Sequence, residues 1–176
     1  ARHGVALIVT GGVAPAPSGV TMEGGAVLND ATQLPHHRMV TDAVHNEGGK
    51  IALQILHTGR YSYQPNLVAP SAIQAPINRF TPHALSHDEI LALIDDFARC
   101  AALAREAGYD GVEVMGSEGY LINEFLAART NQRDDEWGGD YARRMRFAVE
   151  VVRAVRERAG ADFIIILDRK STRLNS

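Results

Sequence analysis

The strongest constraint on the fold is a regular alternation of short apolar runs with amphipathic segments along the 176 residues. Strands are predicted at residues 4–12, 50–56, 111–115 and 162–167, where β-branched residues are bounded by glycine and polar residues. The first of these, "GVALIVTGG", is typical of a strand buried on both faces. Because strands and helices alternate strictly, the sequence predicts an α/β fold with a parallel sheet and right-handed crossovers.

The helices are predicted at residues 35–47, 86–107, 120–126 and 140–160. Ser86 followed by Glu89 is a capping-box signature at the start of the second helix. The apolar positions of that helix repeat at helical spacing: Ile90, Leu93, Ile94, Phe97, Ala101 and Ala104. The Pro-rich segment 61–85 is too long for a simple connector, and segments of this length are more often functional.

Two architectures fit this order of elements, an open doubly wound sheet and a (β/α)8 barrel. A dinucleotide-binding start needs G-x-G-x-x-G leading into a helix, and "GGVAPAP" has the wrong spacing and two prolines. The barrel is favoured because polar residues lie at or just beyond the carboxyl ends of the predicted strands, where barrels hold their active sites. These residues are Thr10, Gln54, His57, Arg60, Glu118 and Tyr120. A whole barrel needs about 250 residues, so we expect a partial TIM (β/α)8 barrel of about four consecutive βα units.

Composition excludes several function classes. The net charge is −3, and the arginines between residues 143 and 158 repeat at helical spacing among acids, which indicates a solvated helix face and no nucleic-acid partner. Cys100 is the only cysteine, so this chain alone cannot form a disulfide or ligate an iron–sulfur cluster, and no metal ligands are predicted. No long apolar run or signal pattern is present, which predicts no membrane partner and a cytoplasmic location.

Two long segments carry a family resemblance. "ALQILHTGR" (52–60) and "GYDGVEVMGSEGYLINEFLAARTNQRDDEWGGDYARRMRFAVEVV" (108–152) resemble the Old Yellow Enzyme class of FMN-binding barrels, over roughly residues 2–166. In broader members of the class, the strand holding Val114 is followed by two histidines, or a histidine and an asparagine, that bind the substrate carbonyl. This sequence has Met115 and Glu118 in those places and keeps Tyr120. It therefore most resembles the branch of bacterial 2,4-dienoyl-CoA reductases.

The resemblance implies FMN as the cofactor of this domain and assigns two residues to it. The family's glutamine at Gln54 forks its amide onto the pyrimidine edge of the flavin, and the backbone at Gly12 approaches the flavin closely. From the sequence alone, the alternative for Gln54 is a buried strand amide satisfied by neighbouring backbone, and the alternative for Gly12 is an ordinary turn glycine. His57 is interpreted only as a residue that lines the site.

Tyr120 matches the catalytic tyrosine of the family, which donates a proton after hydride transfer. As the first aromatic residue of a short amphipathic helix, it could instead be a packed tyrosine with its hydroxyl at the surface. A phenol with a pKa near 10 is a weak acid, so a catalytic role needs pre-organised partners. Glu118 is the predicted partner in that proton relay, and the alternative is a solvated loop carboxylate.

Arg129 coincides with a substrate-binding arginine of the family. The alternative is a surface ion pair with Asp134 or Asp135. The following "NQRDDEWGG" is rich in turn residues and is interpreted as a segment that shapes the long connection. Its loop-forming residues are Asn131, Arg133, Trp137, Gly138 and Gly139.

The resemblance stops near the end of the fourth predicted strand. The predicted barrel domain covers residues 1–167, and residues 168–176 are interpreted as a disordered tail that is foreign to the family. Family members carry an arginine at the strand end that contacts the flavin, where this chain has Asp168. Arg169 does not replace it, because a shift of one residue points a strand side chain to the opposite face.

Taken together, these features predict a fragment of an NADPH-dependent flavin oxidoreductase that reduces conjugated dienoyl-CoA thioesters in unsaturated fatty acid β-oxidation. The resemblance implies that the intact relative also uses FAD, a 4Fe-4S cluster and NADPH, whose sites lie outside this chain. An acyl-CoA is the predicted small-molecule partner. Two alternatives remain: another Old Yellow Enzyme-like oxidoreductase acting on an enoate or an amine, and an inactive half-barrel.

Overall fold

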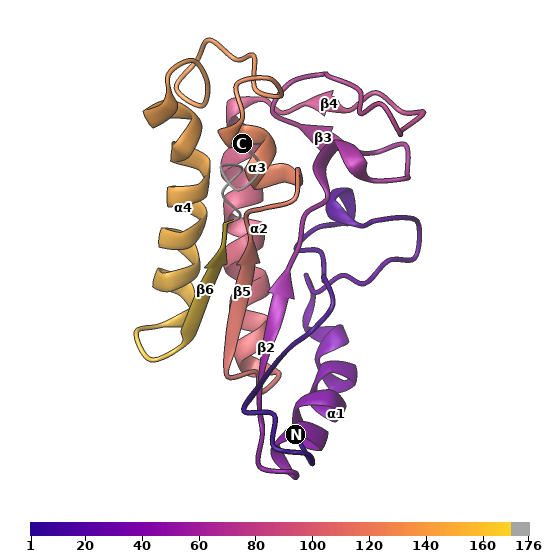
Figure 1. The fold of residues 1–176 in the computed structure, drawn as a ribbon, viewed down its shortest axis with the longest axis vertical. Helices are drawn as coiled ribbons and strands as arrows, with labels where there is room; N and C mark the ends of the chain where they lie inside the picture. Colours follow the sequence, from indigo (N-terminus) through magenta and orange to yellow (C-terminus); the bar gives the residue numbers. More distant parts are fainter. Residues whose placement is uncertain (170–176) are drawn as a thin grey trace.

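The computed structural model describes residues 1–169, so residues 170–176 of the predicted tail lie outside the described residues. One parallel sheet contains β1 (Leu7–Val9), β2 (Lys50–Ile55), β5 (Gly111–Met115) and β6 (Ile164–Asp168) in the order β1-β2-β5-β6 (Figure 1). A separate pair, β3 (Val68–Ala69) and β4 (His83–Ala84), lies in the long segment between β2 and the next major helix. The prediction of four parallel strands in an α/β fold is confirmed.

Four α-helices connect the strands and confirm the predicted positions. They are α1 (Leu34–His45), α2 (His87–Glu106), α3 (Leu121–Leu126) and α4 (Tyr141–Ala159). At the start of α2, Ser86 Oγ accepts a hydrogen bond from the Glu89 N–H at 3.3 Å, and the Glu89 carboxylate accepts one from the Ser86 N–H at 2.7 Å. This is the capping box that the sequence predicts. None of the helices in residues 1–169 has the length and apolar character needed to cross a bilayer.

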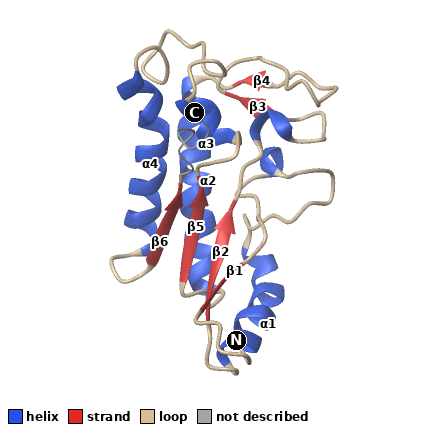
Figure 2. Ribbon diagram, viewed as in Figure 1, coloured by secondary structure: helices blue, strands red, loops and turns tan. Residues whose placement is uncertain are grey.

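The helices cover one face of the sheet. In Figure 2 the strands lie in front of α2, with α1 near β2 and α4 beside β6. Side chains on this outer face form the core, including Leu53, Ile55, Val112 and Val114, which are all fully buried. The alternate strand positions point to the other face, which would line the interior of a closed barrel. We call this second face the inner face.

The prediction that the first strand is buried on both faces is wrong for the described chain. Leu7 and Val9 are 38% and 36% exposed, and only Ile8 packs against the core. The reason is that Leu7 and Val9 belong to the inner face, which no helix covers in residues 1–169, and that β1 pairs only with β2. Their apolar character suits the inside of a barrel, but the chain described contains only some of the strands that would close it.

The last strand, β6, begins two residues later and ends one residue later than the predicted strand 162–167. β6 ends at Asp168, which is in register with Met115 of β5. The predicted domain boundary after residue 167 therefore lies one residue inside a strand.

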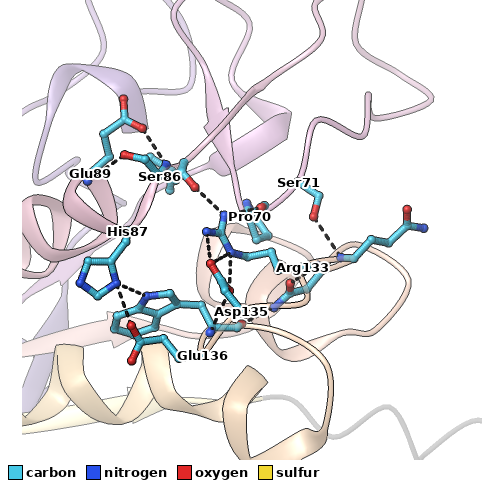
Figure 3. A network of polar contacts seen from close by, with 12 residues as sticks. Pro70, Ser71, Ser86, His87, Glu89, Arg133, Asp135 and Glu136 are labelled. Carbon is cyan, nitrogen blue, oxygen red and sulfur yellow. Dashed lines mark hydrogen bonds and ion pairs between the residues drawn. The ribbon is translucent and has the colours of Figure 1, made fainter.

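The segment between α3 and α4 is held by a polar network (Figure 3). The Arg133 guanidinium donates hydrogen bonds to the Asp135 carboxylate and to the carbonyls of Pro70 and Leu85, so one side chain joins this segment to β3 and to the start of α2. Trp137 is buried, and its indole N–H donates to His87 Nδ1 at 3.1 Å. These contacts agree with the prediction that the segment is built by its turn and loop residues.

We expect the isolated chain 1–176 to self-associate. Its inner face exposes Leu7, Val9 and Ile164. The edge strands of the sheet, β1 and β6, each have one unpaired edge in the described residues. Size-exclusion chromatography with light scattering should show oligomers or aggregates. A monodisperse monomer that melts cooperatively would contradict this expectation.

Candidate active site

The predicted site residues lie at the carboxyl edge of the sheet. In Figure 1 the arrowheads of β2, β5 and β6 point toward the end of the molecule that carries α3, β3 and β4. Thr10 follows β1, His57 and Arg60 follow β2, and Glu118 and Tyr120 follow β5. Because all four strands are parallel, these connections meet at one edge, as the sequence predicts.

Gln54 lies on the inner face, one residue before the end of β2. Its amide Nε2 donates a hydrogen bond to Glu113 Oε1 at 2.7 Å, and Glu113 is its register partner on β5. The Gln54 backbone N–H donates to Thr10 Oγ1 at 3.0 Å, and its carbonyl accepts from the Val13 N–H at 2.9 Å. The amide NH2 group is thus bonded to a carboxylate and not to neighbouring backbone, whereas Oε1 accepts no hydrogen bond within residues 1–169.

Gly12 lies where the chain after β1 runs against the residue after β2. A Cβ at Gly12 would come within 2.4 Å of Leu56 Cδ2 and 2.8 Å of Leu56 Cβ. The backbone hydrogen bonds from Val13 to Gln54 and from Leu56 to Val13 hold this close approach. Close packing against Leu56 is therefore a structural reason for glycine at position 12. The contact of its backbone with the flavin stays a prediction.

A tight turn delivers Tyr120 to the start of α3. The Tyr120 N–H donates to the Ser117 carbonyl at 3.3 Å, and the two residues between them both have positive φ, 62° at Glu118 and 87° at Gly119. Glu118 is the only residue other than glycine with positive φ in residues 1–169. A left-handed conformation costs a side chain such as glutamate about 1 kcal/mol. Strain of this kind often marks a functional position.

The ring of Tyr120 makes a packing contact that explains an aromatic residue here, but this contact does not explain the hydroxyl. The half-buried ring stands edge-on to Tyr61, with centroids 6.3 Å apart and an angle of 89° between the planes. Tyr120 is the N-cap residue of α3 and makes no side-chain cap, while its carbonyl accepts from the Glu124 N–H at 2.8 Å. Within residues 1–169 the hydroxyl has no hydrogen-bond partner.

Arg129 is exposed in the segment after α3. It makes no hydrogen bond or ion pair within residues 1–169, and Asp135 pairs with Arg133 instead. The alternative of an ion pair between Arg129 and Asp135 is therefore not what the structure shows. Its role toward a substrate stays a prediction.

Asp168 and Arg169 point in different directions. The Asp168 carboxylate accepts a hydrogen bond from Ser117 Oγ, and its carbonyl accepts from the Gly116 N–H at 2.8 Å, so Asp168 braces the turn that carries Tyr120. The Arg169 guanidinium instead donates to the Tyr141 hydroxyl at 3.0 Å, on the side of α4. This confirms that Arg169 does not take the place of a strand-end arginine at position 168.

An apolar pocket of about 260 Å³ lies on that outer side, away from the predicted site residues. It is lined by residues of α3, α4 and β6, among them Ile122, Met145, Val149 and Leu167. In a barrel the unit that follows β6 packs at this place. We therefore do not assign the pocket to the active site.

His57 is a structural residue of the loop after β2. Its ring is buried, Nδ1 accepts from the Gly59 N–H at 3.2 Å, and Nε2 lies 3.2 Å from Ser18 Oγ. Burial lowers the pKa of His57 to about 3, so the ring is neutral. The ring stacks on Phe97 of α2 with centroids 6.5 Å apart, and its interpretation as a residue that lines the site stays a prediction.

The sequence analysis missed Glu124, a buried carboxylate four residues after Tyr120. Its Oε1 accepts a hydrogen bond from the Arg60 backbone N–H at 3.0 Å, and Oε2 has no partner within residues 1–169. Burial raises its pKa to about 8, and the Arg60 hydrogen bond and charge oppose the shift only in part. Gly59, at φ 58°, has no room for a Cβ, which would lie 2.4 Å from Oε1. An acid inside the apolar "LINEFL" was the signal that could have found it.

We expect Glu124→Gln to change how stability depends on pH. The folded-state pKa of about 8 lies above the ordinary 4.5, so the contribution of protonated Glu124 is complete below about pH 4.5 and is lost as the pH rises through 8. The glutamine keeps the acceptor for Arg60 and does not ionise. In the full-length protein, its free energy of unfolding should exceed that of wild type by on the order of a few kcal/mol near pH 9.

The measurement is urea unfolding from about pH 5 to pH 9. The matched control is Glu157→Gln, which removes an exposed carboxylate on α4 and should follow the wild-type pH profile. Parallel profiles for wild type and Glu124→Gln would show that Glu124 does not hold a proton in the folded state.

Comparison with known proteins identifies the family of this fold. The profile of the NADH:flavin oxidoreductase / NADH oxidase family matches residues 1–173. The N,N-dimethylglycine/sarcosine dehydrogenase of Chromohalobacter salexigens is 39% identical over 172 residues, which are 94% of this chain and 25% of that protein. The chain thus spans about a quarter of the length of this relative.

Two solved structures share the fold. A 2-naphthoyl-CoA reductase in complex with 2-naphthoyl-CoA superposes with a TM-score of 0.88 at 30% identity, covering 94% of this chain and 28% of that one. Morphinone reductase in complex with tetrahydroNAD superposes with a TM-score of 0.84 at 36% identity, covering 92% of this chain and 50% of that one. The chain belongs to the NADH:flavin oxidoreductase / NADH oxidase family, the Old Yellow Enzyme-like FMN oxidoreductases, and forms part of their TIM barrel.

Proposed function

We propose that this chain forms part of the flavin and substrate site of a reductase that acts on conjugated CoA thioesters, with a 2,4-dienoyl-CoA as the expected substrate. The observation that carries the proposal is the Tyr120 hydroxyl, which lies at the carboxyl edge of the sheet and has no hydrogen-bond partner in the part of the chain that the structure describes. It stands beside a turn in which Glu118 has a left-handed backbone. Met115 and Glu118 stand where broader family members bind a carbonyl with histidine or asparagine. The likeness to a 2-naphthoyl-CoA reductase supports a thioester substrate.

The inner face suits the pyrimidine edge of FMN. Gln54 presents an amide oxygen that no group in residues 1–169 uses, and an amide can pair with the donors and acceptors of that edge. Gln54 would hold the flavin there, and the Gly12 backbone would approach it. When bound, FMN supplies the hydride.

Tyr120 is proposed to donate the proton that completes the reduction. Hydride addition to a conjugated thioester leaves negative charge delocalised toward the carbonyl, and the phenol then protonates carbon. Glu118 would tune the proton relay that supplies Tyr120. Arg129, exposed and without an ion pair, would bind an anionic group of the acyl-CoA, since a guanidinium suits phosphate.

The whole protein would draw on more than this chain. We propose that electrons pass from NADPH through FAD and a 4Fe-4S cluster, held outside these residues, to the FMN of the barrel. The expected setting is cytoplasmic β-oxidation of unsaturated fatty acids.

A second candidate is oxidation of a methylated amine. It is favoured by the 39% identity to N,N-dimethylglycine/sarcosine dehydrogenase. The two candidates differ in the direction of electron flow at the flavin, because an amine would reduce the flavin and a dienoyl-CoA would oxidise it. Anaerobic mixing of the full-length protein with each substrate class therefore separates them.

We expect Tyr120→Phe to slow substrate reduction and to spare flavin reduction. The change removes the proton donor and keeps the ring that packs on Tyr61. Turnover with dienoyl-CoA should fall by roughly 10²–10⁴, the usual effect of losing a general acid, and mainly in kcat. Stopped-flow absorbance measures flavin reduction by NADPH and reoxidation by dienoyl-CoA separately.

The matched control is Tyr141→Phe, which removes a phenol hydroxyl at the first residue of α4, on the outer side. It should leave both rates at wild-type values. If Tyr120→Phe reoxidises as fast as wild type, the tyrosine has only a packing role. If only amines exchange electrons with the flavin, the thioester assignment is wrong.

Glu118→Asn separates the backbone of the turn from its carboxylate. Asparagine tolerates positive φ better than glutamate, so the variant should melt at the same or a slightly higher temperature. If the carboxylate tunes the proton relay, reoxidation by dienoyl-CoA should slow and its pH profile should shift. A reoxidation rate and pH profile equal to wild type would make Glu118 a solvated turn residue.

A further inference from the structure

The inner face carries an acidic residue that the proposed function leaves unexplained. Glu113 stands in the middle of β5, directly opposite Gln54 in register, with Ile166 of β6 on its other side. It is partly buried, and its Oε1 accepts the hydrogen bond from Gln54 Nε2 at 2.7 Å. Within residues 1–169 Glu113 forms no ion pair.

An acid at this position is a poor choice for stability alone. A carboxylate on an inward-facing strand loses solvation, and a cation normally compensates that loss. Lys50 lies at the start of β2 and pairs with Asp110. Glu113 instead bonds to the neutral amide of Gln54.

The partner determines how that amide is turned. A carboxylate accepts hydrogen bonds, so it pairs with the NH2 group of a glutamine and not with its oxygen. With Nε2 held by Glu113, Oε1 remains as an acceptor at the inner face. A second amide opposite Gln54 could bond to either its NH2 group or its oxygen, so it would not fix which of the two faces the site.

We propose that Glu113 is a positioning residue for the flavin: it holds the Gln54 amide so that Oε1 accepts from N3–H of the pyrimidine ring. The remaining Nε2 hydrogen can then reach a neighbouring ring carbonyl. The inference rests on the proposed function in one respect, the contact between Gln54 and FMN. Glu113 itself need not touch the flavin, because its effect is transmitted through the amide.

The test measures FMN binding to the apo form of the full-length protein by flavin fluorescence, so it needs no turnover. Gln54→Ala should raise the Kd for FMN, and Glu113→Met, which keeps the side-chain length and removes the acceptor, should raise it about tenfold, as for the loss of one hydrogen bond. The double variant should bind FMN no more weakly than Gln54→Ala alone. This lack of additivity is the signature of a residue that acts through another.

Glu113→Gln is the conservative variant. It keeps an acceptor but allows both orientations of the amide pair, so its Kd should rise by only about twofold, because an even split between orientations halves the competent population. The ¹⁵N shift of N3 in bound, labelled FMN should move toward a weaker hydrogen bond in both Glu113 variants. Glu157→Gln on the outer surface is the charge-matched control and should match wild type in both measurements.

The outcomes separate the inference from the function on which it rests. If Gln54→Ala binds FMN as tightly as wild type, the proposed flavin contact is wrong and the inference is overturned with it. If Gln54→Ala weakens binding while both Glu113 variants keep the wild-type Kd and N3 shift, only the positioning role is overturned. Additive effects in the double variant would also overturn it, and thermal melting of each apo variant confirms that the variant is folded.

Discussion

The candidate site depends on the parallel pairing of β2 with β5. This register sets Gln54 opposite Glu113 on the inner face and Leu53 and Ile55 opposite Val112 and Val114 on the outer face. A shift of one residue would exchange the two faces, burying the polar pair under α2 and exposing the core. The same parallel direction brings the ends of both strands to one edge, where the loop after β2 meets the turn that carries Tyr120. Core packing and site geometry are therefore consequences of one ladder.

The carboxyl edge holds several polar groups under conditions that stability alone would not favour. Glu124 is buried, its pKa is raised, and one of its carboxylate oxygens has no partner among the described residues. Glu118 adopts a left-handed backbone. Asp168 accepts a hydrogen bond from Ser117 Oγ, at the position where the family resemblance predicts an arginine that contacts the flavin. Such departures concentrate at functional sites because the surrounding fold stabilises them. Here the hydrogen bonds to Arg60, Ser117 and Tyr120 supply that support.

The sequence predicted the order and type of the elements well, since apolar periodicity and the Ser86–Glu89 capping box are local signals. It could not predict which partners the polar residues choose. The hydrogen bond between Gln54 and Glu113 joins residues 59 positions apart in the sequence, and the one between Glu124 and the Arg60 backbone joins residues 64 positions apart. The exposure of Leu7 and Val9 was also missed, because a strand's burial depends on strands that pair with it from elsewhere. Local patterns thus gave the scaffold and the edge that carries the site, and long-range pairing decided its chemistry.

The inner face also explains why these residues need the rest of a barrel. In the described chain Gln54 and Glu113 lie on a face that no helix covers, so water competes for their hydrogen bond and screens the charge of Glu113. Closing the barrel would exclude that water, which would strengthen the hydrogen bond and reduce the screening of the Glu113 charge. It would also place Tyr120 in a site where a weak acid can act. The energetic worth of each site residue is therefore a property of the closed barrel, although the geometry that aims the residues is already present in these four strands.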